Sequence, residues 1–164
     1  MSPENLVLRP AEPADSATIA GFVRELADYE KLAHEAVATE EAIRRSLFGP
    51  TPAAEVVLAE LGSGPVGFAL YFTSYSTFLG RPGIYLEDLF VRSAHRGIGI
   101  GKALLREIAR IACERGCGRL EWAVLDWNEP AISFYERMGA SAMNEWTTYR
   151  LSGAALRAMA QLRD

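Results

Sequence analysis

Three glycines at alternate positions, Gly97, Gly99 and Gly101, form the most informative loop of the sequence. The loop follows an apolar segment typical of a β-strand, residues 84–91, and precedes a long amphipathic segment typical of a helix. Glycine lets the backbone approach a ligand closely and leaves amides free to donate. Since a helix N-terminus carries partial positive charge, the loop predicts a phosphate or pyrophosphate site, although a tight turn alone would also use glycines there.

Two common phosphate-binding loops do not fit these residues. A P-loop needs Ser or Thr after Gly-Lys to bind magnesium, but Ala103 follows Lys102. Arg96 also stands where the first P-loop glycine belongs. The dinucleotide fingerprint Gly-x-Gly-x-x-Gly would need glycine in place of Lys102, and it normally follows the first strand of the fold. These differences disfavour both an NTPase and a nicotinamide-dependent enzyme.

The composition predicts one compact domain over residues 1–164. Apolar residues make up 49% of the chain and charged residues 23%, as in ordinary globular proteins. The net charge of −4 argues against a nucleic-acid partner, which needs a basic face, and is compatible with a cationic substrate. The N-terminal residues do not resemble a signal peptide, and no apolar run is long enough to span a bilayer. We therefore expect a cytoplasmic protein with no membrane partner.

The cysteines and histidines predict neither a disulfide nor a metal site. Cys113 and Cys117 are the only cysteines, and two reduced thiols are the simplest interpretation. His34 and His95 lie far apart in the chain and have no cysteine at the spacing of a zinc site. We expect no bound metal.

The hydrophobic pattern predicts an α/β (α+β) chain with one mixed, mostly antiparallel sheet and helices on both of its faces. A strand–helix–strand unit over residues 84–125 implies one parallel pair with a right-handed crossover. A loop is expected at residues 76–83. The expected strands are residues 6–9, 55–61, 66–75, 84–91, 119–125 and 143–151, and the expected helices begin near residues 15, 39, 100 and 128 and close to the C-terminus.

The pattern Arg96-x-x-Gly99-x-Gly101, placed after a strand and before a long helix, resembles the acetyl-CoA loop of the GCN5-related N-acetyltransferases. Residues 128–140, with Asn near the start of a helix and Tyr one turn before its end, resemble the second signature of that superfamily. The segments at residues 26–30, 66–69, 85–91 and 127–130 are similar to the spermidine/spermine (diamine) branch, which includes thialysine N-acetyltransferases. The resemblance covers nearly the whole chain and implies the GNAT fold.

The resemblance implies acetyl-CoA as cosubstrate. The pantetheine arm would lie along the strand before the loop, at Leu89, Phe90 and Val91, where a backbone amide could stabilise the charge that develops on the thioester oxygen. Asn128 would contact the cofactor from the other side of the cleft. The pyrophosphate would be held by Arg96, Gly97, Ile98, Gly99, Ile100, Gly101 and Lys102.

The same resemblance assigns the proton transfers. An alkyl ammonium has a pKa of ~10.4, so only about one molecule in a thousand is ready to attack at neutral pH. Glu87 would receive its proton through an ordered water and would also attract the cation, whereas strand alternation places Asp88 on the opposite face as a structural residue. Tyr135 would donate a proton to the departing thiolate. The amine would attack directly in a ternary complex, because neither cysteine is placed as a nucleophile.

For the acceptor, the resemblance implies a small-molecule amine bound by Tyr29, Glu30, Glu87, Glu121 and Trp122, in a homodimer. The polyamine enzymes carry an acidic residue where this chain has Ser76, and the following loop contains Arg81. Both differences favour a shorter amine, or one that bears a carboxylate, over a long polycation.

Two other functions stay open at this point. One is acetylation of a protein or peptide amine or of an antibiotic, and the other is a non-catalytic CoA-binding module. The presence of both Glu87 and Tyr135 counts against a module without turnover.

Overall fold

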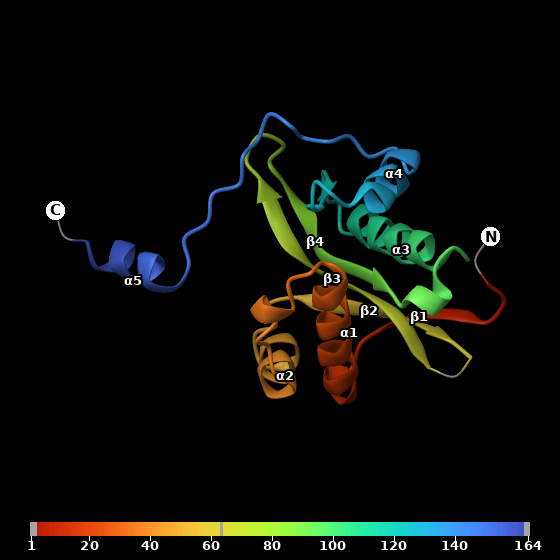
Figure 1. Cartoon of the computed structure of the whole chain (residues 1–164). Coiled ribbons are helices and arrows are strands. Elements are labelled where there is room, and N and C mark those ends of the chain that lie inside the picture. The colour runs from red at the N-terminus through yellow and green to blue at the C-terminus, as the bar shows by residue number, and fades with distance from the viewer. Residues whose placement is uncertain (1–2, 63, 163–164) are drawn as a thin grey trace. The chain divides into compact units, whose positions relative to one another are not determined.

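A mixed five-stranded sheet forms the framework of the computed structural model, which describes residues 3–62 and 64–162. The strands follow chain order across the sheet, with antiparallel pairing from the first to the fourth and parallel pairing between the last two. The predicted sheet class is therefore confirmed. The strands are β1 (Leu6–Pro10), β2 (Glu55–Leu61), β3 (Pro65–Ser76), β4 (Arg81–Val91) and β5 (Leu120–Glu121) (Figure 1).

Helices cover both faces of this sheet, as the sequence predicted. On one face, α1 (Ser16–Tyr29) and α2 (Glu40–Phe48) contribute to an apolar cluster in which Phe22 of α1 stacks on Phe68 of β3 with ring centroids 5.3 Å apart. On the other face lies α3 (Ile100–Glu114), whose buried side chains include Ile100, Leu104, Leu105 and Ile108 (Figure 1). Short 3-10 turns precede or follow these helices at Pro13–Asp15, Ala33–Glu35 and Ser93–His95.

The chain divides into two compact units, and the boundary falls after Leu125. The second unit contains α4 (Glu129–Arg137) and α5 (Gly153–Gln161), both close to the predicted positions. Asn128 caps α4, because its side-chain oxygen accepts a hydrogen bond from the amide of Ala131 at 3.4 Å. None of the described helices is both long and apolar enough to cross a membrane.

The hairpin between β3 and β4 is longer than predicted. Residues 76–83 were expected to form a loop, but Ser76 and Arg81 are paired strand residues, so the connection is only residues 77–80. The buried hydroxyl of Ser76 accepts a hydrogen bond from the amide of Leu79 at 3.2 Å, and Gly80 adopts φ +60°. Strand pairing thus continues into residues, such as Pro82 and Gly83, whose types are more typical of loops.

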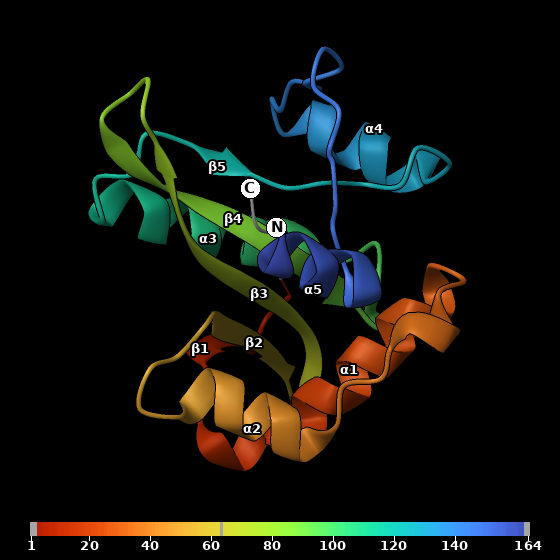
Figure 2. The same cartoon turned by 90° about the vertical axis from the view of Figure 1, so that its left-hand side faces the viewer.

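Two predicted strands are wrong in extent or in kind. The strand expected at 119–125 pairs only at Leu120 and Glu121, because β5 separates from β4 beyond these residues (Figure 2). Residues 143–151 do not form a strand, although the segment contains residue types that favour strands, such as Trp146 and Tyr149. Both of these side chains are exposed, and no described strand pairs with the segment, so strand propensity alone is insufficient.

Phe68→Ala should lower the free energy of unfolding by about 3–5 kcal/mol, because it leaves a cavity beneath the Phe22 ring. Urea denaturation followed by circular dichroism measures this change. The matched control is Phe78→Ala, in which a 94% exposed ring is removed and the change should stay within about 0.5 kcal/mol. Equal effects of the two substitutions would contradict the assignment of the core.

Candidate active site

The glycine loop ends in a helix N-terminus that has no side-chain cap. Gly97 and Gly99 adopt positive φ values of 80° and 92°, and Gly99 is the N-cap of α3 without a capping side chain. Among the described residues, the amides of 97–102 form no backbone hydrogen bond, and the first amide to do so is that of Ala103, which donates to the Gly99 carbonyl at 3.0 Å. Donors that remain free at the positive end of a helix suit a pyrophosphate group.

The outer edge of β4 is open next to this loop. β5 pairs with Ile84 and Tyr85 only, so no described strand borders residues 86–91 on the side away from β3. The side chains of Phe90 and Val91 are buried, with 6% and 8% exposure, so they can offer a ligand little besides their backbone groups. An extended ligand could pair with this edge as a further strand and reach the free amides of the loop.

Arg96 connects the loop to α1 and to β4. Its guanidinium lies over the Tyr29 ring at 4.4 Å and over the Phe90 ring at 5.4 Å, and its Nε donates to the Val91 carbonyl at 2.7 Å. The Arg96 amide donates to Ser93. Arg96 therefore packs against Tyr29 and Phe90 and is held by the Val91 carbonyl, which places the Tyr29 ring against the loop.

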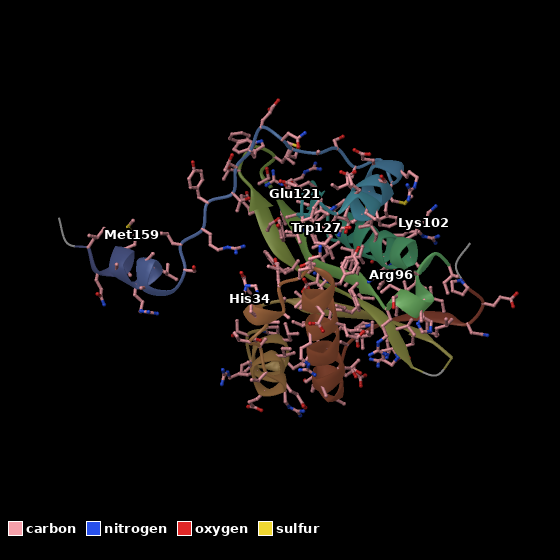
Figure 3. All side chains as sticks on the ribbon, viewed as in Figure 1. His34, Arg96, Lys102, Glu121, Trp127 and Met159 are labelled. Carbon is pink, nitrogen blue, oxygen red and sulfur yellow. The ribbon has the colours of Figure 1, made fainter. Side chains whose placement is uncertain are left out.

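Lys102 presents a second cation at the same place. It is exposed in the first turn of α3, and Figure 3 shows Lys102 and Arg96 near the start of this helix. An ammonium group beside free amides adds attraction for a phosphate. The loop therefore supplies both backbone donors and positive charge.

A β-bulge at Glu87 interrupts the alternation of β4. Leu70 of β3 is opposite Asp88, whereas the next residue, Tyr71, is opposite Leu86, so Glu87 is the extra residue. Because directly paired residues share a face of the sheet, Asp88 lies on the same face as Leu70, which packs against the cluster below α1 and α2.

The bulge changes the face of Tyr85. Simple alternation along β4 places Glu87 with Tyr85, Leu89 and Val91, and Asp88 opposite all of them. In the structure Tyr85 stacks on Phe72, two residues beyond Leu70 on the α1 face, with ring centroids 5.2 Å apart. Asp88 is therefore on the same face as Tyr85, and Leu89 and Val91 are on the other.

Acidic side chains gather around Asp88. Burial, together with the nearby negative charges of Glu87 and Glu30, raises the pKa of Asp88 to about 7. Burial also raises the pKa of Glu30, which directly follows α1. The sequence did not single out Asp88 as a site residue because the bulge is set by pairing with β3, which no local pattern reveals.

The other residues predicted to bind the acceptor lie on two different elements, the end of α1 and the β5 region. Tyr29 is partly exposed at the end of α1, and Glu121 lies opposite Tyr85 but forms an ion pair with Arg119 at 2.7 Å. Trp122 is half-buried immediately after β5. The first unit thus brings together Tyr29, Glu30 and Glu87, while the carboxylate of Glu121 is already paired.

Asn128 and Tyr135 belong to the second unit. Asn128 is buried at the start of α4, and Tyr135 lies near the end of this helix, where its ring contacts Phe134 at a centroid distance of 5.3 Å. The predicted arrangement of Asn and Tyr on one helix is therefore present. Among the described residues, no three His, Cys, Asp or Glu side chains are grouped as metal ligands would be.

The chain is similar to known acetyltransferases. The acetyltransferase (GNAT) family profile matches residues 17–140. The thialysine N-epsilon-acetyltransferase of Bos taurus is 40% identical, with 94% of this chain and 97% of that protein covered. The L-ornithine N5-acetyltransferase of Arabidopsis thaliana is 34% identical, with coverage of 94% and 88%. A solved integron cassette protein from V. cholerae is 28% identical with a TM-score of 0.82, covering 98% of this chain and 100% of that one.

Gly97→Ala should weaken CoA binding about 5-fold. Alanine at φ +80° strains the backbone of the loop by about 1 kcal/mol or more, and the added Cβ would meet no other atom within 4 Å. Isothermal titration with CoA measures the dissociation constant. Gly21→Ala in α1 also enters open space, but at a helical position, and should leave binding unchanged. Undiminished affinity in Gly97→Ala would show that the loop conformation does not support the cofactor.

Proposed function

The chain belongs to the acetyltransferase (GNAT) family, and from this premise we propose that it transfers acetyl from acetyl-CoA to a primary amine of a small diamine, polyamine or thialysine-like amino acid. One observation carries the proposal: the open edge of β4 leads directly to the uncapped N-terminus of α3. The names of the similar proteins, which refer to thialysine and ornithine, support a short amine that bears a carboxylate.

The cofactor is proposed to lie along that edge. Its pantetheine arm pairs with the backbone of Leu89, Phe90 and Val91, and its pyrophosphate binds the amides of residues 97–102 with the charge of Lys102. Asn128 contacts the cofactor from the second unit, in keeping with the family signature. The family profile runs across the boundary at Leu125, which supports the proposal that both units form one domain.

The acceptor is proposed to bind near Tyr29 and the carboxylates of Glu30 and Glu87, with Glu121 and Trp122 at the β5 end of the same site. Negative charge on this face of β4 favours an ammonium group. Ser76 is buried within its turn and adds no negative charge, while the exposed Arg81 beside it suits a carboxylate. A short amine with a carboxylate fits these charges better than a long polycation.

The proposed reaction is direct attack in a ternary complex. The acceptor ammonium loses a proton to a carboxylate, and the resemblance assigns this role to Glu87 acting through a water. The amine nitrogen attacks the thioester carbon, a backbone amide at the β4 edge stabilises the oxyanion, and the C–S bond breaks. Tyr135 protonates the thiolate. Positioning of both reactants in one site supplies much of the acceleration.

An assay of free thiol release with acetyl-CoA and a panel of amines tests the function. Thialysine, ornithine and short diamines should have kcat/KM at least about 10-fold above that of spermidine, equivalent to about 1.4 kcal/mol of transition-state stabilisation. A preference for an aminoglycoside or a lysine peptide would favour the other enzyme functions. No thiol release with any amine, although CoA binds, would leave a non-catalytic module.

Tyr135→Phe should lower kcat about 100-fold with little change in the KM for acetyl-CoA, because the thiolate loses its proton donor. The steady-state rate with the best amine of the panel measures this effect. Tyr149→Phe is the matched control in the same unit, since that side chain is 91% exposed. Unchanged turnover in Tyr135→Phe would exclude the tyrosine as the required acid.

We also propose that the protein is a homodimer, as in the diamine branch that it resembles. Light scattering of the purified protein, which measures the mass in solution, is the direct test.

A further inference from the structure

The bulge in β4 places a second carboxyl group on the proposed acceptor face. Glu87 is the extra residue of the bulge and is exposed, whereas Asp88 is turned toward the α1 side and is half-buried opposite Leu70. A strand without a bulge would keep two adjacent carboxylates on opposite faces. Here the pairing with β3 brings the less exposed acid to the face on which Tyr29 and Glu30 end α1.

The surroundings of Asp88 favour a carboxyl that holds a proton. The two charges that act on it are negative, Glu87 from its own strand and Glu30 from the end of α1, and both raise its pKa. β3 contributes the uncharged Leu70, and Tyr85 lies two pairs along β4, with Glu121 of β5 acting on that phenol.

The two arginines that follow β4 on this side of the sheet, Arg92 and Arg96, are engaged elsewhere. Arg92 forms an ion pair with Glu25 of α1 at 2.9 Å. The Nε of Arg96 donates to the Val91 carbonyl, and its guanidinium lies over the rings of Tyr29 and Phe90. Among the described residues, no hydrogen bond or ion pair involving the Asp88 carboxyl is found. A half-buried acid that is surrounded by like charge and has no partner is suited to take up a proton from a cationic ligand.

We propose that Asp88, and not Glu87, is the group that receives the proton of the acceptor ammonium, while Glu87 attracts the cation. This inference rests on the proposed acetyltransferase function. One N–H bond of the ammonium breaks, and an O–H bond forms on the Asp88 carboxylate. The freed lone pair attacks the thioester carbon, and the C–S bond breaks. The thiolate gains a proton from Tyr135, the new amide nitrogen gives its second proton back to the Tyr135 phenolate, and the proton on Asp88 leaves to solvent.

The pH profiles of two variants separate the two carboxyls. In the wild type, log kcat/KM for the amine should rise with pH up to a bend near 7, because Asp88 must be ionised to accept the proton. Asp88→Asn should lose this bend and lower kcat about 100-fold. Glu87→Gln should keep a bend, moved to lower pH because a negative neighbour is lost, and should mainly raise the KM for the amine.

A measurement without turnover gives an independent test. With 13C-labelled aspartate, one carboxyl signal should titrate near pH 7, should be missing in Asp88→Asn, and should move to lower pH in Glu87→Gln. Asp28→Asn, which changes an exposed acid on α1, should leave both this signal and the rate unchanged. CoA binding reports whether each variant is folded.

The proposal is overturned if Asp88→Asn keeps the bend near pH 7 while Glu87→Gln abolishes it, or if no aspartate titrates there. A wild type that binds CoA but releases no thiol with any amine would instead refute the acetyltransferase function, which the aspartate titration does not depend on.

Discussion

The central constraint on this structure is that β4 is paired fully on one side and only briefly on the other. Its pairing with β3 continues to Val91, which holds the strand in the core, while β5 accompanies it over two residue pairs. The bulge at Glu87 and the unpaired edge therefore lie on the same strand, and the glycine loop follows directly after it. The backbone groups proposed for the cofactor and the carboxylates proposed for the cation are therefore placed by the same strand.

Membership of the GNAT family explains the features proposed to bind acetyl-CoA. The features proposed to bind the acceptor amine depend on contacts particular to this chain. Arg96 contacts both the Tyr29 ring at the end of α1 and the Val91 carbonyl before the glycine loop, so it links the two proposed sites. The acidic face is built from α1 and β4 together. A shift of α1 would therefore alter both the charge and the wall of the proposed acceptor site.

Local chemistry and the class of the sheet could be predicted from the sequence, but the register and extent of strand pairing could not. The glycine loop and the start of α2 near residue 39 depend on neighbouring residues, and both are present as expected. Thr39 caps α2 by accepting a hydrogen bond from the Ala42 amide at 3.2 Å. The bulge at Glu87 depends on which residue of β3 lies opposite, so alternation wrongly placed Tyr85 and Asp88 on different faces. Residues 143–151 show the same limit, since residues that favour strands form one only where a partner strand exists.

The half-buried position of Asp88 also has a thermodynamic consequence for the fold. Its pKa of about 7 lies above the ordinary aspartate value of 3.8, so the folded chain binds this proton more tightly than the unfolded chain does. The associated stabilisation is complete below about pH 4 and disappears as the pH rises through 7. At neutral pH the ionised Asp88 therefore lowers the free energy of unfolding. Such a loss of stability is common at residues that serve function, and Asp88 is the carboxyl proposed to exchange a proton.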